Sequence, residues 1–153
     1  MLKHRQSRVR MEQSILSREM PQFQLYDLGD EVYFEGWQST SMQRQTYRLK
    51  LVLPEWYPDE MPILYVDYPL TLYKYRYQGT INSEGLSHSF HTKFNGPNGC
   101  VQICHTDLAN WDASKTCVGV FMKSIIWLKA YEKHLVTGRT IAEIIDDWRK
   151  EVN

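Results

Sequence analysis

The side chains best suited to chemistry gather in one stretch of the chain. Two of the three cysteines, Cys100 and Cys104, lie there, together with His91 and Asp107. A thiolate is a good nucleophile and a good leaving group, so a cysteine suits a protein that passes an acyl group from one partner to the next. A protonated His91 or His105 would raise the thiolate fraction of a neighbouring thiol. The pattern predicts a nucleophilic cysteine, and both Cys100 and Cys104 are candidates.

The same stretch contains the ligand types of a zinc site. His88 and His91 are separated by two residues, and Cys100 and Cys104 by three. Two imidazoles and two thiolates at such spacings resemble a structural zinc centre, which is tetrahedral. The third cysteine, Cys117, falls on the apolar face of a predicted helix and is expected in the core. A metal site is therefore an alternative to nucleophilic chemistry.

The residues between His91 and Cys104 predict a tight reversal of the chain. Asn-Gly pairs, which are strong turn formers, begin at Asn95 and Asn98. The reversal would put His91 and Cys104 on opposite sides of the turn. A tetrahedral intermediate at the sulfur would need a donor for its oxyanion, either an amide of Asn95 or Asn98 or a backbone N–H beside Cys104. Asp107 is a candidate to orient or deprotonate an attacking amine, or else caps an N–H of its own loop.

The elements that must position these residues follow from hydrophobic periodicity. A helix over residues 5–20 precedes four short extended segments, which are typical of an antiparallel meander. A loop of the length that comes next is often functional. Helix, antiparallel sheet, long loop and two helices predict an α+β fold. The predicted strands are 23–28, 31–37, 47–53 and 63–66, the loop is 67–100, and helices run from Cys117 to a stop at Gly138 and from Thr140 onward.

Composition narrows the class of protein. The chain has 153 residues, of which 42% are apolar and 24% charged, so we expect a single soluble domain over residues 1–153. Eighteen basic and eighteen acidic side chains cancel, which argues against a nucleic-acid-binding polycation. No apolar run approaches the roughly 20 residues needed to span a membrane. An odd number of cysteines without a signal-like segment predicts a reducing, cytoplasmic location.

Charge is nevertheless uneven at the beginning of the chain. Five basic side chains crowd the first ten residues, and no acidic residue lies among them. They form either a solvated helix face or a docking surface for an acidic partner. The residues are Lys3, His4, Arg5, Arg8 and Arg10.

An ordered set of residues resembles a known family. Tyr57-Pro58 is followed by Pro62, then come His91, the pair Ile103-Cys104 and Trp111, with two helices after them. In this order over residues 5–150, the chain resembles the ubiquitin-conjugating enzymes. The segment 127–138, with its Trp-Leu, Tyr-Glu and Thr-Gly pairs, is most similar to bacterial relatives. Such relatives occur in antiphage defence operons, including the cyclic-oligonucleotide (CBASS) systems.

The resemblance implies a role for each candidate. Cys104 would accept a protein C-terminus as a thioester, and His91 would hold the loop through a side-chain to backbone hydrogen bond. Gly96 stands where the family has an asparagine, so Asn95 or Asn98 would supply the amide donor. Asp107 would assist the incoming amine. No cofactor and no metal are implied, and a non-catalytic binding module of the same fold is the alternative that Cys104 disfavours.

The same resemblance implies the partners. The acyl donor would be a ubiquitin-like modifier or another protein C-terminus, such as that of a nucleotidyltransferase partner, and an activating enzyme would deliver it. The acceptor would be an amine of a target protein. In the family, the face of the first helix commonly meets the activating enzyme. Neither nucleic acid nor a membrane is expected to bind.

Overall fold

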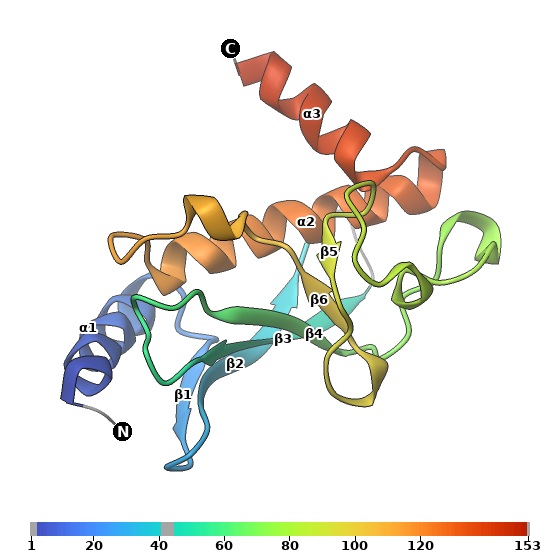
Figure 1. Cartoon of the computed structure of the whole chain (residues 1–153). Coiled ribbons are helices and arrows are strands. Elements are labelled where there is room, and N and C mark those ends of the chain that lie inside the picture. Colours follow the sequence, from blue (N-terminus) through green and yellow to red (C-terminus); the bar gives the residue numbers. More distant parts are fainter. Residues whose placement is uncertain (1–2, 41–44, 153) are drawn as a thin grey trace.

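A six-stranded antiparallel sheet lies against one long helix (Figure 1). The structure is a computed structural model that describes residues 3–40 and 45–152, and the side chains of Lys3 and His4 lie outside what it describes. The predicted α+β fold is confirmed, and the sheet order is β1-β2-β3-β4-β6-β5. The strands are β1 (Gln24–Asp27), β2 (Val32–Ser39), β3 (Thr46–Leu53), β4 (Ile63–Tyr68), β5 (Thr92–Lys93) and β6 (Val101–Ile103).

The first four strands form the predicted meander. Each pairs antiparallel with the next, and β3 alternates between buried and half-buried residues along its length. Successive side chains of a strand point to opposite faces, so the apolar residues of β3 all reach one side of the sheet. That side is the core. Its β3 members are Tyr47, Leu49, Leu51 and Leu53.

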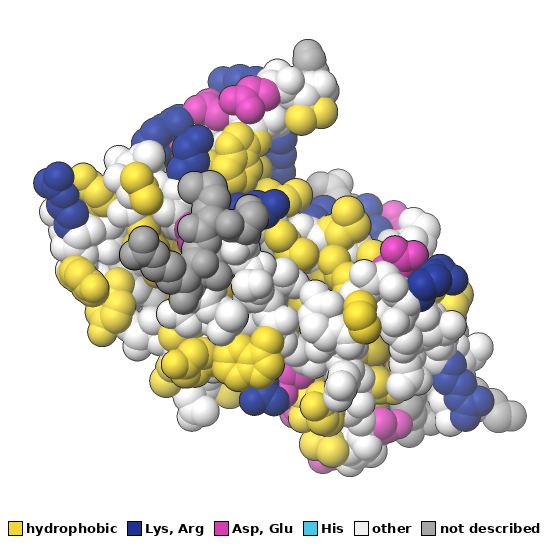
Figure 2. All heavy atoms as spheres, turned by 180° about the vertical axis from the view of Figure 1, so that it is seen from behind, with side chains coloured by type: hydrophobic (Ala, Val, Ile, Leu, Met, Phe, Trp, Pro, Cys, Tyr) yellow, Lys and Arg dark blue, Asp and Glu magenta, His cyan; other side chains and the backbone are white. Residues whose placement is uncertain are grey.

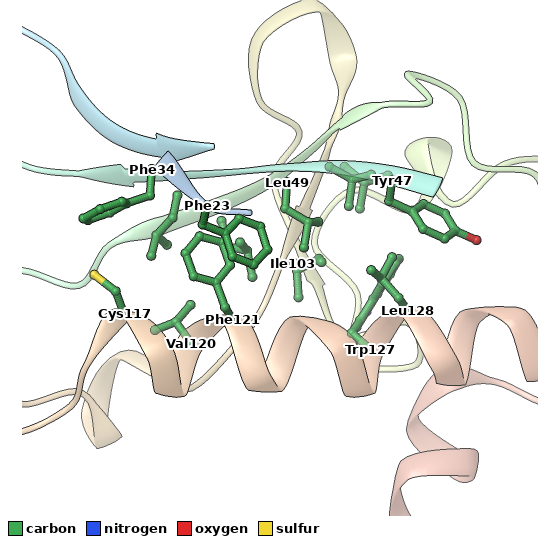
Figure 3. Packing of buried hydrophobic residues seen from close by; sticks show 14 of the residues in the cluster. Phe23, Phe34, Tyr47, Leu49, Ile103, Cys117, Val120, Phe121, Trp127 and Leu128 are labelled. Carbon is green, nitrogen blue, oxygen red and sulfur yellow. The ribbon is translucent and has the colours of Figure 1, made fainter. Parts of the chain in front are cut away.

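Helix α2 (Cys117–Thr137) covers the apolar side of the sheet (Figure 3). It begins at a Thr116 cap, whose side chain accepts from the Gly119 N–H, and ends at Gly138, which adopts the left-handed conformation with φ 77°. The ring of Phe121 stacks on that of Phe23 with centroids 3.7 Å apart. Because one face of α2 is buried against the sheet, its opposite side and edges are left to face the loops around Cys104.

Helix α1 (Lys3–Glu19) packs beside α2, and two of its arginines point inward. Arg5 is 5% exposed and donates to the Leu53 carbonyl at 3.1 Å. Arg8 donates to the carbonyls of Ala113 and Lys115 at 2.6 and 2.5 Å. These two guanidinium groups are bonded to carbonyls of other segments, so neither alternative, a solvated helix face or a docking surface, describes them. Among the described basic side chains in the first ten residues, Arg10 is the exposed one.

The segment 67–100, which was predicted as a long structured loop, contains short 3-10 turns and the strand β5. This strand pairs with β6, which follows the segment, and the resulting hairpin adds two strands to the meander. Strands of two and three residues are too short to show a sequence period, which explains why the pattern missed them. The Asn82 side chain joins the parts of this segment, since its amide donates to the carbonyls of Leu70 and Gly99 at 2.7 and 2.8 Å.

Helix α3 (Ile141–Val152) follows α2 after a sharp turn and projects from its end (Figure 1). The predicted capping box is confirmed, because the Glu143 N–H donates to Thr140 Oγ1 at 3.2 Å and the Thr140 N–H to Glu143 Oε1 at 3.3 Å. Within the described ranges, no helix has the length and apolar character to cross a membrane. Figure 2 shows basic and acidic side chains interspersed with hydrophobic ones on the face turned away in Figure 1.

Candidate active site

Cys104 lies at the open end of the β5–β6 hairpin. Its N–H donates to the carbonyl of His91 at 2.9 Å, and the next pair of the ladder is Thr92 with Ile103. The predicted reversal, with His91 and Cys104 on its two sides, is therefore confirmed. His91 adopts a left-handed conformation with φ 50°, which turns the chain into β5. Because Ile103 fills the core, the following cysteine leaves the sheet and its side chain is half-buried.

A groove of about 1870 Å³ opens beside this sulfur. Its walls come from the segment that leads into β5, the β5–β6 hairpin itself, the loop after Cys104, one edge of α2 and one face of α3. A peptide chain bound there would reach the sulfur from solvent. The residues on which the argument below depends are His91, Lys93, Cys104, Asp107, Lys123 and Trp148.

Burial and nearby charges act in opposite directions on the thiol. Burial raises the pKa of Cys104 above its ordinary value, and the carboxylate of Asp107 adds to this rise. The ammonium groups of Lys93 and Lys123 lower the same pKa. Sγ lies 3.5 Å from the carbonyl oxygen of Thr106. The thiol is therefore chiefly protonated at neutral pH, with two cations close enough to favour its ionised form.

Neither neighbouring histidine supplies the expected imidazolium. Burial lowers the pKa of His91, and His88 and Arg149 lower it further, while its buried Nε2 has no hydrogen-bond partner among the described residues. Burial also lowers the pKa of His105, whose Nε2 lies 2.8 Å from the Pro62 carbonyl oxygen. Both rings are thus neutral near pH 7. The His91 main chain, through its carbonyl, is what ties this residue to Cys104.

Two lysines provide the positive charge near the Cys104 thiol that was expected from a histidine, and the sequence did not predict either of them. Lys93 is the second residue of β5, and Lys123 lies in the second turn of α2. A lysine on a helix has no local signal that it faces a particular loop, because the buried face of α2 decides which residues turn toward Cys104.

The two asparagines expected to donate an amide are not beside the sulfur. Asn98 sits in the turn that closes the hairpin, with φ 60°, and Cys104 is at the opposite end of β6. The Asn95 amide donates to the Asn82 carbonyl at 2.8 Å. The whole length of β6, roughly 10 Å at the usual rise of a strand, separates the turn from the sulfur. This corrects the expected site position of Asn98, which is exposed and shapes the turn instead.

Asp107 remains available for chemistry. It is exposed, lines the groove together with Cys104, and precedes the 3-10 turn Leu108–Asn110. Its backbone carbonyl accepts from the Asn110 N–H at 2.9 Å, whereas its side chain makes no capping bond. The alternative in which this carboxylate caps its own loop is therefore not observed.

The two remaining thiols are enclosed. Cys117 is 0% exposed, and its predicted place in the core is confirmed. Cys100 is 3% exposed and precedes β6, whereas Cys104 follows it. The two cysteines of the proposed zinc set thus stand at opposite ends of one strand. Among residues 3–40 and 45–152, no group of three or more histidine, cysteine, aspartate or glutamate side chains is arranged to hold a metal ion.

The loop after Cys104 is fixed to the proline-rich segment. Trp111 Nε1 donates to the Pro58 carbonyl at 2.8 Å, and the Trp111 ring lies against Tyr57, with centroids 6.3 Å apart. The same ring contacts His105 edge to face at 5.8 Å. The Tyr-Pro pair and the tryptophan, which are far apart in the sequence, thus meet and brace the chain on the far side of the cysteine.

Comparison with known proteins identifies no relative. No family model, curated protein or solved structure matches the chain. The function must therefore be argued from the arrangement around Cys104.

Proposed function

We propose that this chain is a ubiquitin-conjugating-enzyme-like cysteine acyltransferase, which accepts a protein C-terminus as a thioester on Cys104 and passes it to an amine. The observation that carries the proposal is the half-buried Cys104 at the head of a long groove, with Lys93, Lys123 and Asp107 around it. The ordered helix, antiparallel meander and two closing helices are compatible with that family.

The first step transfers the acyl group to the enzyme. The Cys104 thiolate attacks the thioester carbonyl of an activated donor, a new C–S bond forms, and the donor's thiolate leaves. Lys93 and Lys123 favour the thiolate that attacks, and their charge also stabilises the oxyanion of the tetrahedral intermediate. The side-chain amides of Asn95 and Asn98 are remote from the sulfur. The oxyanion is therefore stabilised by these ammonium groups and by main-chain N–H groups, and not by Asn98.

The second step transfers the acyl group to the target. A neutral amine attacks the Cys104 thioester, the C–N bond forms, and the Cys104 thiolate leaves. The proton lost by the amine passes to Asp107 or to water. The Asp107 carboxylate is suited to accept it because this side chain is exposed and makes no capping hydrogen bond. Asp107 also attracts a lysine ammonium to the mouth of the groove before it is deprotonated.

The sequence resemblance supports a setting for this activity. We propose that the protein acts in the bacterial cytoplasm in antiviral defence of the CBASS type. An activating enzyme would deliver the acyl group, which would come from a ubiquitin-like modifier or from a nucleotidyltransferase partner. The similarity of segment 127–138 to bacterial conjugating enzymes is the basis of this proposal.

Charging with a matched activating enzyme, modifier and ATP tests the activity. Wild-type protein should form an adduct that a thiol reductant removes, and Cys104→Ser should form an adduct that resists the reductant because an ester replaces the thioester. Cys104→Ala should form none. Cys100→Ser, at a buried thiol outside the groove, serves as the matched control and should charge like the wild type. A reductant-sensitive adduct on Cys104→Ala would overturn the assignment to Cys104, whereas a wild-type protein that forms no adduct would leave a binding module as the better interpretation.

A further inference from the structure

One edge of α2 leads away from the proposed nucleophile. Lys123, Ile126 and Lys129 all line the groove and follow one another at intervals of three residues. Residues three apart are neighbours on the surface of a helix, so this row runs along α2 and partly around it. Lys123 is the member whose charge acts on the Cys104 thiol. At about 1.5 Å per residue, Lys129 lies roughly 9 Å further along the helix axis.

The wall that faces this edge comes from α3. Ile145, Trp148, Arg149 and Val152 line the groove and share one helix face. Val152 is 85% exposed, and the Arg149 side chain is 67% exposed. Arg149 has one acidic neighbour, Asp146, at 3.6 Å. The far part of the groove therefore offers exposed apolar side chains beside cationic ones.

The charge of the lining is unbalanced although the chain as a whole is neutral. Five lysine and arginine residues line the groove, against two aspartates. Both aspartates belong to the loop between Cys104 and α2, whereas α2 and α3 contribute basic residues and no acidic ones to the lining. A low-dielectric cleft lined by one sign of charge attracts the opposite sign. The cationic residues are Lys93, Lys115, Lys123, Lys129 and Arg149.

We infer that the α2–α3 part of this groove binds the C-terminal tail of the acyl donor and selects tails with acidic and apolar side chains. The inference rests on the proposed function, because the tail is the chain that ends at Cys104. An extended peptide covers about 3.3 Å per residue, so the roughly 9 Å from Lys123 to Lys129 corresponds to about three residues. The acidic residue that meets Lys129 and Arg149 should thus stand at least three residues before the acylated carboxyl.

The amine of a target protein, which is the acyl acceptor, is unsuited to the basic wall formed by α2 and α3. A target lysine carries a positive charge until it is deprotonated, and Lys129 and Arg149 would repel it. Asp107, which lines the groove from the loop after the cysteine and whose charge acts on the Cys104 thiol, would receive that amine instead. Charge therefore divides the site into a cationic channel for the donor tail and an acidic entrance for the acceptor.

Synthetic peptide thioesters test the inference without an activating enzyme. Two peptides ending in glycine as the mercaptoethanesulfonate thioester would differ in one position, aspartate or lysine, four residues before the glycine, with a leucine beside it. In each transfer the Cys104 sulfur bonds to the carbonyl carbon, the bond to the mercaptoethanesulfonate sulfur breaks, that sulfur leaves as the thiolate, and the Cys104 proton goes to buffer. Intact-mass measurement follows the rate at low and high salt.

We expect the aspartate peptide to charge wild-type protein about tenfold faster at low salt, with the difference shrinking at high salt. The double variant Lys129→Glu, Arg149→Glu should reverse the preference. Lys150→Glu, an exposed change on the same helix outside the groove, should retain it. Equal charging of wild type by both peptides overturns the inference, as does an unaltered preference in a folded double variant, while charging of Cys104 itself leaves the proposed function standing. No charging of Cys104 by either peptide overturns both.

Discussion

Replacing the buried Glu12 with alanine should remove about 3 kcal/mol from the free energy of unfolding. Glu12 has no exposed side-chain surface and accepts three hydrogen bonds, from Arg8 Nε at 2.9 Å, from the Tyr57 hydroxyl at 3.1 Å and from the Cys117 N–H at 2.7 Å. Removing one partner of a buried ion pair typically costs about 3–5 kcal/mol. The lower end applies here because the Arg8 side chain is 15% exposed and keeps two backbone carbonyls as partners.

Replacing Glu12 with glutamine removes the negative charge but keeps the size and shape of the side chain. Glu12→Gln keeps one acceptor oxygen but puts an NH2 group where the second oxygen receives either the Arg8 Nε–H or the Cys117 N–H. Two donors then face each other, and one charge-assisted hydrogen bond, worth about 1.5–3 kcal/mol, is lost. Glu12→Gln should therefore be destabilised by a smaller amount than Glu12→Ala, since it leaves no cavity.

Urea denaturation followed by tryptophan fluorescence measures both effects. For a domain of this size, each kcal/mol corresponds to about 2–4 °C in melting temperature, so Glu12→Ala should melt roughly 6–12 °C lower. Glu19→Ala is the control on the same helix, because its pair with Arg18 at 3.2 Å is exposed and should contribute under about 0.5 kcal/mol. A Glu12→Ala protein as stable as Glu19→Ala would refute the argument from burial.

Three further measurements test other parts of the structure. Because burial raises the pKa of Cys104, its alkylation rate, resolved by mass spectrometry, should still rise with pH above the range of a free thiol; a plateau at lower pH would contradict this. Trp111→Phe leaves the Pro58 carbonyl without its donor and should cost about 1–3 kcal/mol in urea denaturation. Burial and a hydrogen bond to Glu35 raise the pKa of Asp67 from 3.8 to about 7. The folded state therefore binds that proton more tightly, so this stability is present below the ordinary pKa and lost as the pH rises through about 7. Asp67→Asn should flatten this decline, and an unchanged pH profile would be evidence against it.

The parts of the site that the sequence predicts are those decided by local chemistry. The Asn-Gly turns predicted that the chain reverses between His91 and Cys104, and the hairpin confirms it. The error over Asn98 has the same origin. A turn residue was taken as close to the cysteine because few residues separate them, but those residues form β6 and hold the two apart. Closeness in sequence does not give closeness in space once the chain is extended.

The parts that the sequence does not predict depend on where side chains point. Charge counting found the basic beginning of the chain, but Arg5 and Arg8 extend to carbonyls of distant segments instead of to solvent. Long basic side chains can bury their stems while their heads reach polar partners, and composition carries no trace of this. Lys123 is the opposite case, since a residue without a distinguishing pattern is brought to the sulfur by the packing of α2. In both cases tertiary packing decides the role.

The charges around Cys104 bear on how long a thioester would last there. A thiol with a raised pKa is a stronger nucleophile once ionised, but it is also a poorer leaving group. The acyl group on Cys104 should therefore resist water until an amine is held close to Asp107. The stabilising cations are lysines, whereas His91 and His105 are kept neutral by burial. Any pH dependence of charging should then follow the sulfur itself, not a histidine.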